Sequence, residues 1–114
     1  MKYVDLSYLH ELSGNDKDFE KVMMEQFVQQ TLEELNSLQQ AIADNNWLSA
    51  KKIAHSLKST VSYMGLASEL HPSLEAIEKA AVSGNSSEVS SKFSHVKQVA
   101  EEAVKEIVIM LKNS

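Results

Sequence analysis

Residues 50–66, A-K-K-I-A-H-S-L-K-S-T-V-S-Y-M-G-L, carry the pattern on which the fold prediction depends. At about 100° per residue, the apolar side chains of this stretch gather on one side, as expected of an amphipathic helix that faces a core. Those side chains belong to Ala50, Ile53, Ala54, Leu57, Val61 and Met64. His55 lies roughly 160° from Leu57 by the same count, so we expect its imidazole to point into solvent.

The polar face around His55 carries cations and small hydroxyl groups. Its members are Lys51, Lys52, Lys58, Ser59 and Ser62. An exposed imidazole in such surroundings suits a group that accepts a phosphoryl dianion and then gives it up. The simpler interpretation is that a histidine on a polar helix face is only solvated, and that the paired Lys51 and Lys52 serve solubility.

The rest of the chain also predicts helices. Only three glycines and one proline interrupt the 114 residues, and no useful period-2 apolar alternation occurs, so an all-α fold follows. We expect helices over residues 5–12, from 15 or 16 to about 43, over 47–64, over a fourth segment that ends at 83–85, and over about 87–112. Pro72 must lie in the first turn of the fourth helix or break it.

Capping residues indicate several of these boundaries. Asp5 and Asn46 can accept a backbone N–H at the start of a helix. Gly14 and Gly65 can supply the left-handed residue that follows a helix. Short connections make neighbouring helices antiparallel, so we expect an up-down-up-down four-helix bundle with a short extra N-terminal helix over one end.

Each long helix has an apolar stripe that should face this core. In the second helix the stripe consists of Phe27, Thr31, Leu35, Leu38 and Ile42; in the fourth it consists of Leu70, Leu74, Ile77 and Ala81. No linker or internal repeat divides the chain, so residues 1–114 are expected to form one domain, either free-standing or belonging to a longer protein.

Composition excludes several classes of function. The chain has no cysteine, which excludes disulfides, thiolate nucleophiles and zinc ribbons. Its net charge is -5 and all 11 basic residues are lysines, which argues against broad nucleic-acid binding. No apolar run approaches the ~18 residues of a membrane span, and no signal-peptide core opens the chain. We therefore expect a cytoplasmic monomer that binds neither nucleic acid nor membrane.

The segment Ala54-His55-Ser56-Leu57-Lys58, with Gly65 ten positions after the histidine and Leu74-Glu75 further on, resembles the signature of histidine-containing phosphotransfer (HPt) domains. The resemblance covers nearly the whole chain. It implies that His55 is the phosphoacceptor and that Lys58 is the basic residue that stabilises the phosphoryl charge. It also implies a relay of phosphate between aspartates of receiver domains in multistep two-component signalling.

The same resemblance implies the partners, which are response-regulator receiver domains and a hybrid histidine kinase. Mg²⁺ is expected on the receiver only, so no cofactor or metal is expected on this chain. No ATP-binding motif occurs, so the chain should carry phosphate without being a kinase. We expect Ser59, Ser62 and Lys51 to contact the receiver. Met24, Val28 and Leu32 could line the same contact, or could simply continue the core stripe.

One departure from the family pattern keeps an alternative open. Ser59 stands where the family usually has glycine, one turn after His55, and could crowd the approaching receiver. The alternative is a non-catalytic helical adaptor, or a degenerate HPt domain that binds receivers without accepting phosphate. A membrane-surface role for the last helix is disfavoured by Glu101, Glu102 and Glu106, which would repel anionic lipid.

The other three histidines indicate no metal site. His10, His71 and His95 are scattered, and none has a histidine or cysteine at helical spacing. His71 and Glu75 are four residues apart and form at most a chance pair. Glu-x-x-His motifs of di-iron bundles are also missing, since Ser7, Lys52, Ser68 and Lys92 stand three residues before the histidines.

Overall fold

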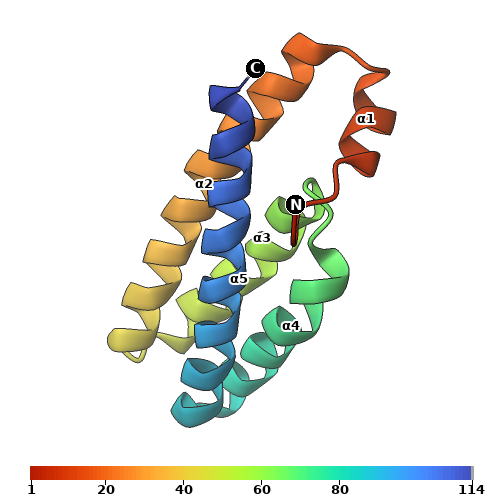
Figure 1. Cartoon of the computed structure of the whole chain (residues 1–114). Helices are drawn as coiled ribbons and strands as arrows, with labels where there is room; N and C mark the ends of the chain where they lie inside the picture. Colours follow the sequence, from red (N-terminus) through yellow and green to blue (C-terminus); the bar gives the residue numbers. More distant parts are fainter. Residues whose placement is uncertain (114) are drawn as a thin grey trace.

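The computed structural model describes residues 1–113. This part of the chain contains five α-helices and no strands. They are α1 (Ser7–Ser13), α2 (Lys17–Ala43), α3 (Trp47–Ser62), α4 (Ala67–Ser83) and α5 (Ser86–Lys112). Figure 1 shows that α2 to α5 run alternately in opposite directions, while the short α1 lies at the end of the bundle where α3 turns into α4. The predicted all-α bundle with a short extra helix is confirmed.

The four long helices form a closed ring of neighbours. Each packs against the next along the chain, and α5 packs against α2 to complete the ring. The resulting bundle measures 44 × 22 × 21 Å. Its fully buried side chains include Leu38, Leu57, Val61, Met64, Leu70, Leu74, Ile77, Val89, Val96 and Ile107. Among the described helices, none is both long enough and apolar enough to cross a membrane.

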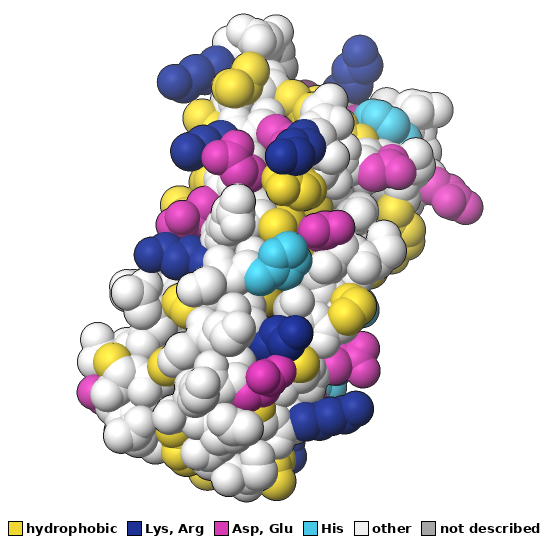
Figure 2. Space-filling view, turned by 60° about the horizontal axis from the view of Figure 1, so that its bottom comes forward, with side chains coloured by type: hydrophobic (Ala, Val, Ile, Leu, Met, Phe, Trp, Pro, Cys, Tyr) yellow, Lys and Arg dark blue, Asp and Glu magenta, His cyan; other side chains and the backbone are white. Residues whose placement is uncertain are grey.

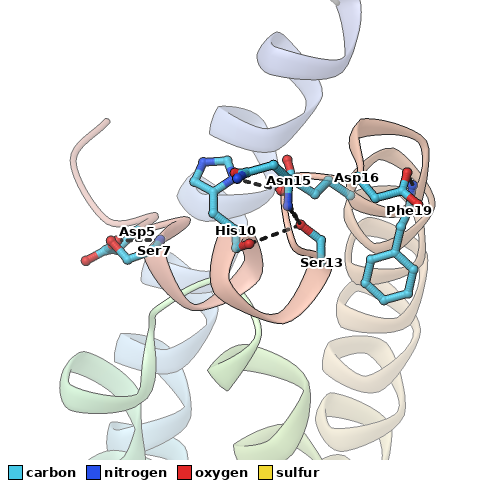
Figure 3. Close-up of polar contacts among 8 residues, drawn as sticks. Asp5, Ser7, His10, Ser13, Asn15, Asp16 and Phe19 are labelled. Carbon is cyan, nitrogen blue, oxygen red and sulfur yellow. Dashed lines mark hydrogen bonds and ion pairs between the residues drawn. The ribbon is translucent and has the colours of Figure 1, made fainter.

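Aspartate side chains accept backbone N–H groups near the starts of both α1 and α2, as Figure 3 shows. The carboxylate of Asp5 accepts the N–H of Ser7 at 2.9 Å, although the N-cap position itself is Leu6. Gly14 ends α1 in the left-handed conformation, as predicted. Asp16 then caps α2, because its carboxylate accepts the N–H of Phe19 at 3.1 Å.

A buried carboxylate holds α1 on α2. Glu20 Oε2 lies 2.8 Å from Nδ1 of His10 and accepts a 2.6 Å hydrogen bond from the hydroxyl of Ser13. The Ser13 hydroxyl, followed by His10, lowers the pKa of Glu20 and so favours its charged form. Sequence analysis did not single out Glu20, because an acidic residue in the first turn of a helix is ordinarily exposed.

The helix α3 is shorter than predicted. Asn46 caps this helix as expected, by accepting the N–H of Ser49 at 3.2 Å. The helix ends at Ser62 rather than at Met64, and the carbonyl of Met64 instead accepts the N–H of Asp5 at 2.9 Å. A segment far away in the sequence therefore packs against the turn that follows the histidine helix.

Pro72 lies inside α4, which corrects the predicted boundary. The helix begins at Ala67, so the proline occupies its second turn instead of opening or breaking the helix. A proline there removes one hydrogen bond, which would go to the carbonyl of Ser68, at a cost of about 3 kcal/mol. Ser68 is exposed, so water can solvate that carbonyl. Full burial of Leu70 and Leu74 on either side of Pro72 offsets the cost.

The stripe of α2 differs from the prediction only in its last turn. Phe27, Thr31, Leu35 and Leu38 are buried, but Ala41 is buried in place of Ile42, which is half-buried. The reason is the tight turn into α3, in which the carbonyl of Ala41 accepts the N–H of Asn46 at 2.8 Å. A small side chain fits beneath that turn.

Candidate functional site

His55 occupies the middle of α3 with its imidazole exposed, as the helical count predicts. Its side chain has 73% relative exposure. Nδ1 lies 3.5 Å from Oε2 of Glu78, on the facing side of α4. The described residues provide no hydrogen bond or ion pair to Nε2, so this nitrogen is open to an incoming group.

Lys58 differs from the prediction, because α4 covers most of it. The side chain of Lys58 is 22% exposed and that of Glu78 is 17% exposed. Lys58 Nζ lies 2.9 Å from Glu78 Oε1, which makes this a partly buried ion pair. Glu78 therefore stands between the lysine and the histidine, with one oxygen toward each.

The opposite edge of α3 is fastened to α2. Both carboxylate oxygens of Glu34 accept hydrogen bonds from α3: the hydroxyl of Ser56 donates to Oε2, and that of Thr60 donates to Oε1 at 2.6 Å. Ser56 follows His55 directly, so the backbone that carries the histidine is held from two sides. Neither Glu34 nor Glu78 was predicted, because each lies more than 20 positions from His55 in the sequence.

A further contact from α4 involves His71 and changes the status of Ser62. The ring N–H at Nε2 of His71 donates to the carbonyl of Lys58 at 2.8 Å, and the hydroxyl of Ser62 donates to the same carbonyl at 2.6 Å. Ser62 is consequently half-buried instead of lying on the open face. His71 has a structural partner, and the described residues contain no group of three or more side chains that could hold a metal ion.

Ser59 lies in the open, at the edge of a groove between α2 and α3. The groove has a volume of about 280 Å³ and is lined by Met23, Gln26, Phe27, Gln30, Ser56, Ser59, Thr60 and Tyr63. Tyr63 also contacts Tyr8 of α1, with ring centroids 6.2 Å apart. Lys51, one turn before His55, is exposed as well. The histidine thus adjoins a shallow, partly apolar surface.

The apolar residues predicted to flank His55 lie on another side of α2. Leu32 lines a groove with Lys97 and Glu101 of α5. Met24 and Val28 are half-buried and pack against the core. The α2 residues that line the groove facing α3 are Met23, Gln26, Phe27 and Gln30. A receiver contact through Met24, Val28 and Leu32 therefore stays a prediction. The partial burial of Met24 and Val28 also fits the alternative that they continue the core stripe.

Charges of both signs share the molecular surface. Figure 2 shows lysine and carboxylate side chains interspersed over the face in view, with histidine among them. This face therefore lacks the continuous basic surface on which nucleic-acid binding depends.

The arrangement around His55 offers a nucleophilic ring nitrogen, a cation and a carboxylate on an open surface, which suits a reaction whose second reactant is carried by another protein.

Comparisons with known proteins agree with this fold. The family model described as "Hpt domain" matches residues 22–112. Among solved structures, the fold is similar to the crystal structure of histidine-containing phosphotransfer protein B (HptB) from Pseudomonas aeruginosa PAO1. That match has a TM-score of 0.86 and 20% sequence identity, and covers 98% of this chain and 96% of the other. A comparison with curated protein sequences finds no match.

Proposed function

Because this chain belongs to the Hpt domain family of two-component signalling, we propose that it is a monomeric phosphoryl carrier in which His55 relays a phosphoryl group between receiver-domain aspartates. Hpt domains carry phosphate and are not kinases, so the donor must be a phosphorylated partner. The observation that supports His55 most directly is its 73% exposed ring on a helix fastened to both neighbours. A rigid, accessible nucleophile is what a carrier needs.

The carboxylate of Glu78 favours one tautomer of the His55 ring, so the two ring nitrogens have different roles. A carboxylate 3.5 Å from Nδ1 favours the tautomer that carries its proton there. The lone pair then resides on Nε2, which faces solvent. Nε2 attacks the phosphorus of the aspartyl phosphate, the P–N bond forms, and the P–O bond breaks with its electron pair leaving on the aspartate. The phosphorylated ring then gives its Nδ1 proton to water, which leaves the ring neutral and the phosphoryl group dianionic. The reverse sequence of bond changes delivers the group to the next receiver.

Lys58 supplies charge at this site. The phosphoryl group on His55 is a dianion next to an ammonium group one turn along the same helix. A flexible lysine can follow the group as it arrives and leaves, without the fixed fork of an arginine. The aspartate and the Mg²⁺ of the receiver pocket belong to the partner, so we propose no cofactor for this chain.

The groove between α2 and α3 is the surface that we assign to receiver docking. It begins at Ser59, one turn from His55, and continues over Met23, Gln26 and Tyr63. Its mixture of apolar and amide side chains, without a large single-sign charge, resembles ordinary transient protein interfaces. The predicted contact residues Met24, Val28 and Leu32 do not line this groove.

The function is tested by offering the protein two donors. With ATP alone we expect no labelling, whereas a phosphorylated receiver domain from a two-component relay should label the protein, because receiver aspartyl phosphate is the donor that the site fits. Radiolabel or phosphate-affinity electrophoresis measures the outcome. Labelling by ATP alone would refute the carrier function.

A degenerate Hpt domain, which binds receivers without taking phosphate, is the second candidate. Ser59 favours it, because the hydroxymethyl group stands at the mouth of the docking groove where the family pattern has glycine. Receiver binding without any transfer would establish this second candidate.

Substitutions of Ser59 test whether a side chain at this position hinders the approach of the receiver to His55. We expect Ser59→Ala and Ser59→Gly to transfer phosphate within about twofold of the parent rate or faster, with Ser59→Gly less stable by roughly 0.5 to 1 kcal/mol. Ser59→Gln should slow transfer by about tenfold or more, because its side chain reaches toward His55 one turn away. Rapid-quench transfer assays measure the rates.

Ser90→Gln is the matched control, since Ser90 is an exposed serine of α5 outside the groove. It should leave the transfer rate unchanged. If Ser59→Gln transfers as fast as this control, the receiver does not approach across the groove and the docking assignment is wrong.

A further inference from the structure

Among residues 1–113, Glu78 is the one carboxylate that forms ion pairs with both groups that the carrier function uses. Its Oε1 lies 2.9 Å from Nζ of Lys58, and its Oε2 lies 3.5 Å from Nδ1 of His55. We propose that Glu78 competes with the phosphoryl group for Lys58, and thereby keeps the phosphohistidine of His55 high in energy and readily transferred. This inference rests on the proposed function of His55, and it adds a control of the transfer equilibrium.

In the unphosphorylated protein the lysine already has a counter-ion. Lys58 and Glu78 are both mostly covered, so their attraction is screened less than that of a pair in open water. The resting ion pair therefore stabilises the free form of the carrier. A phosphoryl group that draws the ammonium toward Nε2 must do so at the expense of this pair.

After transfer, two anions share one nearby cation. The phosphoryl group brings two negative charges, and Glu78 keeps its own. If Lys58 stays with Glu78, the dianion lacks its counter-charge; if it moves to the phosphoryl group, Glu78 is left partly buried without its cation. Either outcome raises the free energy of the phosphorylated form and favours handing the group on to the next receiver.

The burial of Glu78 distinguishes it from other acidic residues of α4. Glu75, three residues earlier, is exposed, and the structure shows no contact between it and Lys58 or His55. A charge at Glu75 is screened by water, so its effect on the phosphohistidine should be small. The two glutamates therefore make a matched pair with the same change in net charge.

The experiment labels His55 with phosphoramidate, a small-molecule donor that needs no partner protein. We expect the phosphohistidine of Glu78→Gln to last about threefold to tenfold longer than that of the parent, as judged from the usual strength of partly exposed ion pairs. In Glu78→Gln, Lys58 has lost its carboxylate partner and can pair with the phosphoryl dianion. It stabilises this dianion more than the metaphosphate-like transition state, in which the oxygens carry less charge, so the barrier to loss of the phosphoryl group rises. The transfer equilibrium with a receiver should shift toward phosphohistidine by a similar factor.

Two comparisons make the result specific. Glu75→Gln should change the lifetime less than twofold. In a Lys58→Ala background the added Glu78→Gln substitution should also change the phosphohistidine lifetime less than twofold, because the lysine for which the two anions compete is then absent. An equal effect with and without Lys58 would overturn the proposal, as would a lifetime in Glu78→Gln that matches the parent.

The design separates this inference from the proposed function. If phosphoramidate labels His55 but no receiver exchanges phosphate with it, the relay function fails while the lifetime comparison still decides the role of Glu78. If phosphoramidate does not label His55 at all, the inference itself is overturned, because it requires a phosphohistidine. Circular dichroism melting of each variant confirms that the bundle is folded during labelling.

Discussion

Replacement of His55 by glutamine should abolish phosphoryl labelling from a phosphorylated receiver while leaving the fold intact. Glutamine has no ring nitrogen that can form the P–N bond. The free energy of unfolding should change by no more than about 0.5 kcal/mol, because the side chain is 73% exposed. Labelling and urea denaturation of the same preparations measure the two effects.

His95→Gln is a closely matched control for this experiment. His95 is also an exposed helical histidine with a ring nitrogen 3.5 Å from a glutamate, in this case Glu69. It lies on α5, away from Lys58 and the α2–α3 groove. We expect full labelling of His95→Gln. Retained label in His55→Gln would mean that another residue accepts phosphate, and a large loss of stability would mean that His55 supports the core.

Helical periodicity predicted the fold because most of the core lies on uninterrupted helices. The spacing of Ala54, Leu57 and Val61 on α3 was sufficient to place the core on one side and His55 on the other, and the structure has this arrangement. Periodicity did not predict helix boundaries that depend on packing between segments. Pro72 was expected to limit α4, but burial of the apolar residues around it holds a continuous helix.

The candidate site was predictable only along α3. His55, Lys58 and Ser59 are neighbours through the helical repeat, so sequence spacing was enough to group them. Glu78 and Glu34 reach the same region from α4 and α2, and their positions depend on how the helices pack. An i, i+3 relation says nothing of that packing. The position of Leu32 beside Lys97 and Glu101 of α5 could not be predicted for the same reason. An apolar stripe shows that one side of α2 is buried but not which neighbour covers each edge.

Gly65 shows how a residue of the family signature can serve the fold. It follows α3 with a φ of 78°, in the left-handed region that favours glycine. A Cβ at this position would lie 2.5 Å from the carbonyl oxygen of Asp5 and 2.7 Å from its Cβ. The N-terminal segment therefore runs directly over the glycine, next to the hydrogen bond from Asp5 N–H to the carbonyl of Met64. Its spacing from His55 reflects the length of α3 and this close approach.

Gly65→Ala should accordingly destabilise the protein by about 2 to 4 kcal/mol. The left-handed conformation costs a residue with a Cβ roughly 1 to 2 kcal/mol, and displacement of Asp5 removes a hydrogen bond worth about 0.5 to 1.5 kcal/mol and loosens the buried Val4 and Leu6. Urea unfolding with linear extrapolation measures the change.

Gly14→Ala provides the control that separates conformational strain from collision. Gly14 also has a positive φ, of 61°, but a Cβ there would meet nothing within 4 Å. Its substitution should cost only the strain, roughly 1 to 2 kcal/mol. At temperatures where Gly65→Ala remains folded, His55 should still accept phosphate, because the change lies at the end of α3 and not at the ring. Equal losses of stability in the two variants would show that the N-terminal segment moves aside freely, and the close packing of Asp5 on Gly65 would then contribute nothing to the fold.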